Sequence, residues 1–380
     1  MNLLREEVGA VESIFGELAR EEIRDLPIYV PGKPIDEVKR ELGLTEIIKL
    51  ASNENPWGPS PRAILAMREA VGDINRYPDA GAFTLKSALG ESYGLSSDHL
   101  LLGNGSEEIV QMIAKAFFRP GEEILMGKPS FPRYETITRL MGAIPREIAL
   151  EEGYYPLRGL ASSITEKTRA IFICNPNNPT GTVLSEQDIQ AFVEQVPSHI
   201  LLIFDEAYIE FSEQSFSGLA FLDEPRPIIV LRTFSKAFGL AGIRLGYAIA
   251  RPELTDALNR VREPFNSNAV ALAGALAAWK DKVYLEEIIQ KNAEERRYVT
   301  GHLLQLGARI YPTETNFIFA FFENSSSNLS QKLLERGIIV RPGVAFGFPA
   351  ALRITFGTHE ENEKFIHSLS EIMEMDKAKS

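Results

Sequence analysis

The chain has 380 residues, 44% of them hydrophobic and 24% charged, which is the composition of a globular protein with room for two or three domains. Its formal charge of −12 argues against a nucleic acid or an anionic membrane surface as the partner, and no run reaches the ~18 apolar residues of a membrane-spanning helix. The one cysteine, Cys174, cannot form an internal disulfide, and the charged N-terminus lacks the apolar core of a signal peptide. We therefore expect a cytoplasmic protein with no membrane or nucleic acid partner.

The first two thirds of the chain alternate between helical and strand patterns. Apolar residues recur at helical spacing over Val8–Leu18, which predicts a leading amphipathic helix. Short apolar runs then predict strands at 123–126, 170–174, 200–204, 228–231 and 246–250. Helices are expected between them, as at 107–117 and 185–194, where Ser185 and Asp188 are spaced as an N-cap. This order predicts an α/β domain with a mainly parallel sheet that is buried on both faces.

The pattern changes near Ala271. The run 271–278 opens a long helical stretch that is expected to continue through 284–298. Shorter elements are predicted after it at 317–322, 329–335, 338–341, 352–356 and 360–373. These elements predict a smaller α+β domain. We expect a large domain over 52–270, and a small domain that combines 1–51, with its N-terminal arm, and 271–380.

Several common site motifs are missing. The run from Gly103 lacks the third glycine of a dinucleotide fingerprint, and no GxxxxGK[ST] loop is present. The five histidines show no metal-ligand spacing, and the single cysteine stands apart from them. The sequence therefore does not favour a nicotinamide dehydrogenase, a nucleotide hydrolase or a metal site.

Polar residues follow two of the predicted strands. Asp205 comes directly after the run ILLIF, and Lys236 lies five residues after the run IIVL. Ligands of open α/β sheets bind at the carboxyl ends of the strands, so both side chains are expected in one crevice. Taken alone, the pair is better explained by a buried ion pair without chemistry.

Residues around Lys236 suit a phosphate dianion. Arg244 lies eight residues after the lysine, and Thr233 and Ser235 flank it with hydroxyls. Upstream, Gly105-Ser106-Glu107 opens a predicted helix whose first N–H groups favour an anion. Each element alone is weak evidence for a phosphate site, since a glycine and a serine at a helix start are often only a helix cap. Together they predict a phosphate site next to an amine and a carboxylate.

An amine, a carboxylate and a phosphate site suit pyridoxal phosphate. The lysine bonds to the aldehyde, and the carboxylate keeps the ring nitrogen protonated so that the ring accepts electrons. Phe131 is a candidate to stack on the ring, although core packing is its simpler interpretation. Asn178 and Tyr208 are candidates to bond the ring hydroxyl, although NPNNPTG around Asn178 also suits a rigid turn.

Six runs occur here in a characteristic order: ASNENP, NPNNPTG, DEAY, RTFSKAFGLAGIRLG, PTETNFIF and LRITFG. In these runs the chain resembles the fold-type I pyridoxal-phosphate aminotransferases. YVPGKP, SNENPWGPSP and RYPD resemble the histidinol-phosphate aminotransferase branch more narrowly. The chain departs from this family at PSFPRYE, where a tyrosine in an aromatic-glycine context is usual. The resemblance implies a large domain with a mainly parallel seven-stranded sheet between helices, and a smaller α+β domain.

The resemblance also implies roles for individual residues. The catalytic residues would be Lys236, Asp205 and Tyr208. The cofactor would be bound by these three and by Gly105, Ser106, Glu107, Phe131, Asn178, Thr233, Ser235 and Arg244, with Tyr77 reaching in from the neighbouring subunit of a homodimer. The substrate would be bound by Tyr29, Asn55, Arg341 and Arg353. Surface ion pairs are the alternative for the two arginines, and packing is the alternative for Tyr29.

The reaction implied by this resemblance is amino transfer from L-histidinol phosphate to 2-oxoglutarate in histidine biosynthesis, which gives imidazole acetol phosphate and L-glutamate. An aromatic amino acid aminotransferase is the first alternative, and a threonine-phosphate decarboxylase is the second. A cofactor-binding sensor joined to a DNA-binding domain is a third. It would need an additional helix-turn-helix module and a basic face, and the acidic chain offers neither.

Overall fold

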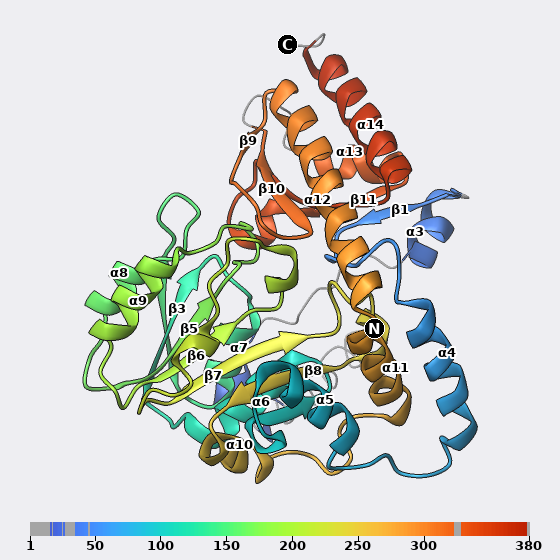
Figure 1. Ribbon diagram of the computed structural model, residues 1–380. Coiled ribbons are helices and arrows are strands. Elements are labelled where there is room, and N and C mark those ends of the chain that lie inside the picture. The colour runs from blue at the N-terminus through green and yellow to red at the C-terminus, as the bar shows by residue number, and fades with distance from the viewer. Residues whose placement is uncertain are drawn as a thin grey trace, which may run out of the picture.

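The computed structural model describes residues 16, 18–24, 26, 35–44, 46–322 and 328–377. These residues form two sheets, with the larger sheet in the lower half of Figure 1 and the smaller one in the upper half. Most of the helix expected over Val8–Leu18 lies outside the described residues, as does Tyr29.

The larger sheet has seven strands and is mainly parallel, as predicted. In spatial order its strands are β2 (Leu100–Gly103), β8 (Gly246–Ala250), β7 (Ile228–Thr233), β6 (Leu201–Asp205), β5 (Thr168–Cys174), β3 (Glu123–Lys128) and β4 (Ile144–Ala149). β8 runs antiparallel to both of its neighbours, β2 and β7, and the other neighbouring strands of this sheet pair in parallel. All five strands predicted here are present with ends within two residues of those expected, whereas β2 and β4 were missed.

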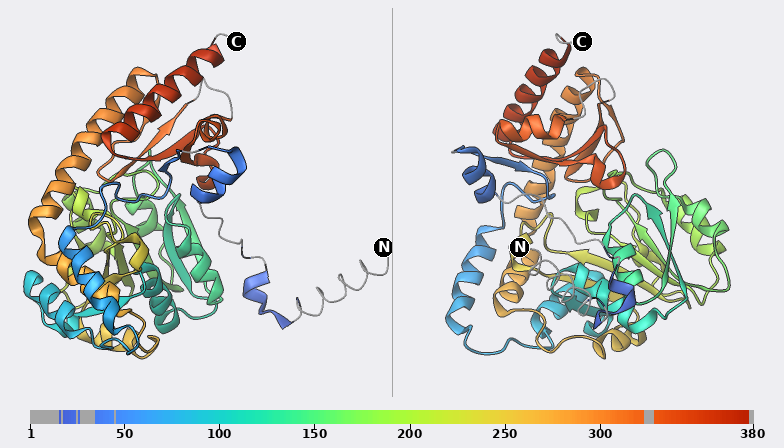
Figure 2. Two further views of the ribbon diagram at one scale, coloured as in Figure 1. Left: turned by 90° about the vertical axis from the view of Figure 1, so that its right-hand side faces the viewer. Right: turned by 180° about the vertical axis from the view of Figure 1, so that it is seen from behind.

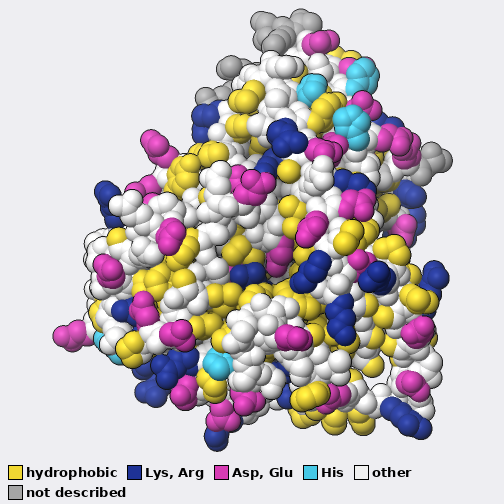
Figure 3. All heavy atoms as spheres, viewed as in Figure 1, with side chains coloured by type: hydrophobic (Ala, Val, Ile, Leu, Met, Phe, Trp, Pro, Cys, Tyr) yellow, Lys and Arg dark blue, Asp and Glu magenta, His cyan; other side chains and the backbone are white. Residues whose placement is uncertain are grey.

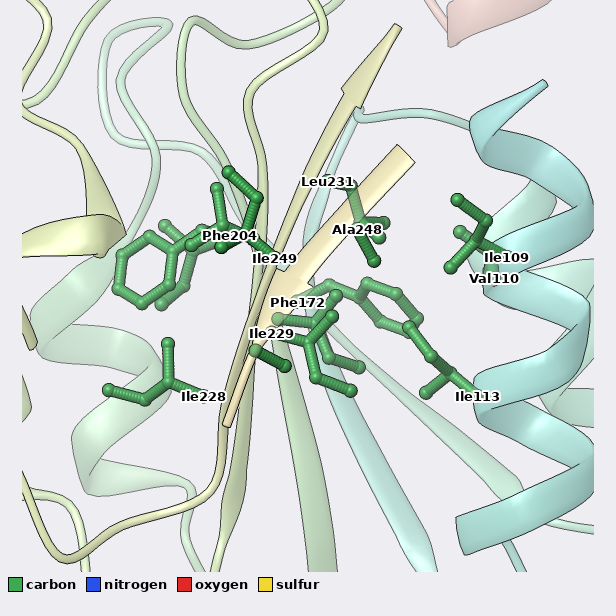
Figure 4. Close-up of a cluster of buried hydrophobic side chains, with 14 of the residues drawn as sticks. Ile109, Val110, Ile113, Phe172, Phe204, Ile228, Ile229, Leu231, Ala248 and Ile249 are labelled. Carbon is green, nitrogen blue, oxygen red and sulfur yellow. The ribbon is translucent and has the colours of Figure 1, made fainter. Parts of the chain in front are cut away.

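Helices cover both faces of this sheet. They are α4 (Pro61–Ala70), α5 (Phe83–Tyr93), α6 (Ser106–Phe117), α7 (Arg133–Leu140), α8 (Leu157–Ser162), α9 (Glu186–Gln195), α10 (Pro252–Asn259) and α11 (Ala269–Lys280). The predicted cap of α9 is confirmed, because Ser185 Oγ accepts a hydrogen bond from the Asp188 amide. Figure 4 shows Ile109 and Ile113 of α6 pointing toward one side of the sheet, with Phe204 on the other side. Burial on both faces explains the continuous apolar runs of these strands.

The smaller sheet has five strands. In spatial order they are β1 (Ile48–Leu50), β11 (Ile338–Pro342), β12 (Ala351–Thr355), β10 (Phe317–Phe321) and β9 (Arg309–Ile310). Its helices are α12 (Lys282–Gln305), α13 (Leu329–Glu335) and α14 (His359–Lys377), and α3 (Ile35–Leu42) packs beside β11 through its buried Val38. The short helix α2 (Glu21–Arg24) contacts α7 of the large sheet. Short 3₁₀ turns lie at Val71–Asp73, Ser97–His99, Ile209–Phe211, Gly218–Phe221, Ala241–Ile243 and Gly343–Phe346.

The long helix predicted from residue 271 onward is wrong as a single element. It breaks at Asp281, where the backbone has φ −90° and ψ 67°, and the Asp281 carboxylate accepts a 2.5 Å hydrogen bond from Ser60. The first part, α11, packs side by side with α4 (Figure 2) and buries Trp279 in the core of the large sheet. The second part, α12, runs from there to the small sheet (Figures 1 and 2). The borders of the large domain, predicted at residues 52 and 270, stay a prediction.

The surface carries charges of both signs. Acidic and basic side chains are interspersed on the face shown in Figure 3. Within the part of the chain that the structure describes, none of the helices combines the length and apolar character that crossing a membrane requires.

Candidate active site

A cavity of about 220 Å³ lies between the carboxyl ends of the large sheet and the small sheet. Twelve of the predicted site residues line it: Ser106, Glu107, Phe131, Asn178, Asp205, Tyr208, Thr233, Ser235, Lys236, Arg244, Arg341 and Arg353. The two sheets therefore build one site together. Asp205 and Lys236 line the same cavity, as their positions after predicted strands led us to expect. A larger cavity of about 500 Å³ between α8 and α9 is lined by none of these residues.

Lys236 presents a buried amine to the cavity. Its Nζ donates to the carbonyl of Ser52 at 3.3 Å and lies 5.5 Å from the centre of the Tyr208 ring. Burial, with a contribution from the Arg353 charge, lowers the pKa of Lys236 to about 8. Lowering the pKa of an amine raises the fraction that is neutral near pH 7, and the neutral form is the nucleophile.

Asp205, the last residue of β6, is 5% exposed. Its Oδ2 accepts a 2.5 Å hydrogen bond from the Tyr134 hydroxyl, and its Oδ1 accepts one of 3.2 Å from the Ala207 amide. Among the described residues Asp205 and Lys236 form no direct ion pair, although the lysine charge still lowers the pKa of the carboxyl group. Burial raises the pKa of Asp205, against the lowering effect of these two donors and of Lys236. A buried carboxylate of this kind is stabilised by a cation in the cavity.

An anion cradle lies at the N-terminus of α6. The N-cap residue Gly105 has φ +79°, and a Cβ atom there would lie 2.4 Å from Nη2 of Arg244. A Cβ atom on Gly246 would lie 2.4 Å from the amide nitrogen of Ser106. Glycine at both positions thus lets the guanidinium approach the first N–H groups of the helix. A helix N-terminus and an arginine together favour a phosphate dianion.

The hydroxyl groups that precede Lys236 complete the cradle. Nη1 of Arg244 donates to Ser235 Oγ at 3.3 Å, and the Ser235 amide donates to Thr233 Oγ1 at 3.0 Å. On the other side, the Glu107 carboxylate pairs with Nε of Arg133 at 2.6 Å. This ion pair reduces the repulsion that Glu107 would exert on a bound anion.

Three side chains form the wall beside the amine. Half-buried Phe131 lies edge-on to Tyr134, with 5.4 Å between ring centres. The Tyr208 hydroxyl accepts a 2.9 Å hydrogen bond from Asn53 Nδ2, and burial raises the pKa of Tyr208. Asn178 Oδ1 accepts a 2.7 Å hydrogen bond from Arg353. The phenol of Tyr208 and the amide of Asn178 thus lie in one wall, and both are groups that can form a hydrogen bond with a hydroxyl on a bound ring.

Two arginines line the small-sheet side. Arg341 and Arg353 lie opposite each other on the antiparallel strands β11 and β12. Arg353 is 7% exposed, donates to the Ala51 carbonyl at 2.7 Å, and has its guanidinium carbon 5.4 Å from the centre of the Phe317 ring and 5.5 Å from that of Phe346. Two guanidinium groups therefore line the same side of the cavity.

Four predicted residues lie elsewhere or act through the backbone. Asn55 donates to the Ala237 carbonyl at 2.9 Å and accepts from the Trp57 amide, so it supports the loop after Lys236 without lining the cavity. Tyr77 is 81% exposed and stacks on Phe265 at 4.6 Å, away from the cavity of its own chain. Gly105 contributes backbone to the cradle, and Tyr29 lies outside the described residues. Substrate binding by Asn55 and Tyr29, and a role for Tyr77 in a partner's site, stay predictions.

The sequence interpretation missed Ser52, Asn53 and Tyr134 among the residues that touch the site. Ser52 and Asn53 line the cavity, and Asn53 has φ +54° and is only 1% exposed. Its amide donates to Thr355 Oγ1 at 2.9 Å, which ties β12 to the Tyr208 wall. The run ASNENP after a strand was a usable signal for Asn53. No spacing pattern indicated Tyr134, because its partner Asp205 lies 71 residues away in the chain.

These residues fit pyridoxal phosphate on structural grounds. The two glycines keep open a cradle that a Cβ atom would fill, and the buried carboxylate of Asp205 matches a ring cation. Lys236 would bond the aldehyde, Asp205 the ring nitrogen, and Arg244 with Ser106 and Ser235 the phosphate. A cofactor of this type, held between a mainly parallel seven-stranded sheet and a smaller domain, defines a fold-type I enzyme.

Comparison with known proteins shows which family of fold-type I enzymes the chain belongs to. The family model of the aminotransferases of class I and II matches residues 45–369. The "Histidinol-phosphate aminotransferase 2" of Carboxydothermus hydrogenoformans is 43% identical over 94% of this chain and 100% of its own length. The histidinol-phosphate aminotransferase of Moorella thermoacetica is 44% identical over 93% of this chain and 92% of its own. The chain belongs to the class I and II aminotransferases, in the branch of the histidinol-phosphate aminotransferases.

Solved structures agree with this assignment. The histidinol-phosphate aminotransferase of Sinorhizobium meliloti, determined in complex with pyridoxal-5'-phosphate, superposes with a TM-score of 0.86 at 26% identity, over 94% of this chain and 98% of that one. The L-threonine-O-3-phosphate decarboxylase of Porphyromonas gingivalis superposes with a TM-score of 0.77 at 22% identity, over 86% of this chain and 100% of that one. At that identity the second similarity shows the fold alone.

Proposed function

We propose that this aminotransferase uses pyridoxal phosphate to transfer the amino group of L-histidinol phosphate to 2-oxoglutarate, forming imidazole acetol phosphate and L-glutamate. The observation that carries the proposal is the pair Arg341 and Arg353, which face the cavity of Lys236 from adjacent strands. Two guanidinium groups suit the phosphate of one substrate and the second carboxylate of the other. The names of the relatives at 43% and 44% identity support the same substrate.

The chain's own groups have distinct tasks in this reaction. When bound, pyridoxal phosphate supplies an electron sink for the charge that develops as a proton leaves the substrate carbon next to the nitrogen. Lys236 Nζ, with its pKa lowered to about 8, accepts that proton and returns it. Asp205 holds a positive charge in the cavity, and Tyr208 with Asn178 orients the bound molecules through the hydroxyl and amide groups.

The reaction would belong to histidine biosynthesis in the cytoplasm. The single cysteine supports that compartment, because Cys174 is buried and free in the described structure. An aromatic amino acid aminotransferase and a threonine-phosphate decarboxylase on the same scaffold are the alternatives. The decarboxylase would release carbon dioxide without 2-oxoglutarate, so a coupled assay of glutamate formation separates it from both transferases.

We expect histidinol phosphate to exceed phenylalanine and tyrosine as amino donor by at least about 10-fold in kcat/KM, because a charge-assisted contact contributes about 2–4 kcal/mol. Dephosphorylated histidinol is expected to be a poor donor for the same reason. Arg341→Ala should lower kcat/KM for histidinol phosphate by about 30-fold and for phenylalanine by less than about 3-fold. Steady-state assays of the donor panel with 2-oxoglutarate measure these ratios.

Arg309→Ala is the matched control, since Arg309 lies on the outer strand β9 over the Phe321 ring. It should leave the ratio of the two donors unchanged. If phenylalanine or tyrosine is a better donor than histidinol phosphate, the proposed substrate is wrong. The protein is then an aromatic amino acid aminotransferase.

We also propose a homodimer with shared active sites. The support is the exposure of large apolar side chains: Tyr77 at 81% and its stacking partner Phe265 at 42%, with Ile74 at 64% and Phe83 at 69% close to Tyr77 in the chain. Exposed apolar patches mark interaction surfaces, and a second copy of this chain is the partner expected from the family resemblance. Tyr77 would then reach the phosphate cradle of the partner subunit.

Mixing two inactive variants tests this arrangement. After subunit exchange between Lys236→Ala and Tyr77→Phe chains, activity should recover to roughly a quarter of wild type, because half of the dimers are mixed and carry one intact site of two. The recovery is measured after exchange has been verified by mass spectrometry of differently tagged chains. An active Tyr77→Phe homodimer would show that Tyr77 has no role, and no recovery in verified mixed dimers would show that it acts within its own chain.

A further inference from the structure

We propose that Tyr134 is a positioning residue for Asp205: its hydroxyl fixes the carboxylate and keeps it a weak enough base to leave the proton on the cofactor's ring nitrogen. This inference rests on the proposed pyridoxal-phosphate chemistry. It concerns the helix α7, whose buried Tyr134 bonds to Asp205 without lining the cavity.

Aromatic neighbours hold the Tyr134 side chain in place. The side chain is fully buried, and its ring stacks on Phe172 with 4.2 Å between centres and 8° between planes. The Phe131 ring lies edge-on to it, at 77° and with 5.4 Å between centres. From this position the hydroxyl donates to Asp205 Oδ2 at 2.5 Å. Contacts with two aromatic rings therefore hold the donor in place before any ligand arrives.

The hydrogen bonds of Asp205 show how little else restrains it. Apart from Tyr134, the described structure gives its carboxylate one further donor, the Ala207 amide at 3.2 Å. That amide belongs to the turn after β6 and stays in place in every side-chain variant. Loss of the Tyr134 hydroxyl would leave Oδ2 buried without this donor, so the carboxylate could turn about its Cβ–Cγ bond.

The charges around Asp205 give the direction of the effect. The titratable groups that interact with it are Tyr134 from α7, Cys174 from β5, Lys236 after β7, Tyr208 after β6, and Tyr155. Burial raises the pKa of Asp205, and the Tyr134 hydrogen bond is the strongest of the effects that lower it. Without that bond the carboxylate is a stronger base. A stronger base competes better for the proton on the ring nitrogen and makes the ring a poorer electron acceptor.

Tyr155 provides a matched control. It is also a buried tyrosine, 4% exposed, and its hydroxyl accepts from the Gly127 amide at 2.9 Å and donates to the Phe172 carbonyl at 2.8 Å. Tyr155→Phe therefore removes buried hydrogen bonds of a tyrosine hydroxyl without removing a hydrogen bond to Asp205. A merely structural role of Tyr134 predicts the same behaviour for the two phenylalanine variants.

The test compares Tyr134→Phe and Tyr155→Phe holoenzymes by titrating the visible absorbance of the bound cofactor with pH. Because a less positive ring makes the Lys236 nitrogen harder to deprotonate, Tyr134→Phe should raise the midpoint by about 0.5–1 pH unit, the size expected for one hydrogen bond. It should also lower kcat by about 10-fold while KM for the donor changes less than about 3-fold. Tyr155→Phe should leave the midpoint within about 0.2 pH unit of wild type.

Two further measurements cover other outcomes. On an Asp205→Asn background, Tyr134→Phe should cost less than about 2-fold in kcat, since the carboxylate it acts on is gone. If Tyr134→Phe fails to fold, difluorotyrosine at position 134 keeps the ring and donates more strongly, so the midpoint should fall instead of rise.

The results separate the two proposals. A wild-type protein that binds no pyridoxal phosphate contradicts the proposed function. A wild-type protein that binds it, with the same midpoint in the Tyr134 and Tyr155 variants, overturns the positioning role alone. A full additional loss from Tyr134→Phe in the Asp205→Asn background, or an unchanged midpoint with difluorotyrosine, overturns it as well.

Discussion

Replacing Lys236 by alanine is expected to lower kcat by about 10³- to 10⁵-fold, because the change removes both the covalent link to the cofactor and the base that moves the substrate proton. The cavity would otherwise persist, since the lysine makes only one hydrogen bond in the described structure, to the Ser52 carbonyl. Cofactor binding should therefore weaken much less than turnover. Single-turnover assays with histidinol phosphate, together with the cofactor dissociation constant, measure the two effects separately.

Lys282→Ala is the matched control for this change. Lys282 lies over the Trp279 ring at the start of α12, outside the cavity, and burial lowers its pKa as well. It should keep activity within about 2-fold of wild type. A small primary amine added to the Lys236→Ala enzyme should restore part of the lost rate. Turnover of the uncomplemented variant near the wild-type value would refute the role of Lys236.

The second large effect is expected for Asp205→Asn, which keeps the shape of the side chain and removes its charge. We expect kcat to fall by about 10³-fold, because the ring nitrogen then lacks the anion that stabilises its protonated form. The dissociation constant of the cofactor should rise by only about 10-fold, since the phosphate cradle is untouched. Equilibrium dialysis and steady-state kinetics give the two numbers.

Asp188→Asn is the control, because Asp188 is an exposed carboxylate in the first turn of α9. It should leave both constants within about 2-fold of wild type. If Asp205→Asn retains a near-normal kcat, the carboxylate has a structural role, and the account of the ring charge is wrong.

Most of the large sheet was predictable because its central strands are buried on both faces and read as continuous apolar runs. The two missed strands lack that signature. β4 alternates half-buried and exposed residues and contains Pro145, and β2 is only four residues long. The break at Asp281 was also hidden, because the flanking residues favour helix on both sides and the carboxylate bonds to Ser60 in a distant segment.

The cavity was predictable where strand ends alone position a residue, as for Asp205 and Thr233. It was not predictable where the backbone turns in an unusual way. In ASNENP the positive φ of Asn53 directs that side chain to Tyr208, while Asn55 bonds to the carbonyl after Lys236. The contact of Tyr134 with Asp205 depends on how α7 packs against the sheet, which local sequence patterns do not encode.

The central claim is that Lys236 holds pyridoxal phosphate in this cavity. Reduction of the holoenzyme with borohydride, followed by proteolysis and mass spectrometry, tests it most directly, because reduction makes the bond between the lysine and the cofactor permanent. The account predicts loss of the visible band and one label per chain, on the peptide that contains Lys236. A label on any other lysine, or a visible band that disappears without a label on the protein, would contradict it.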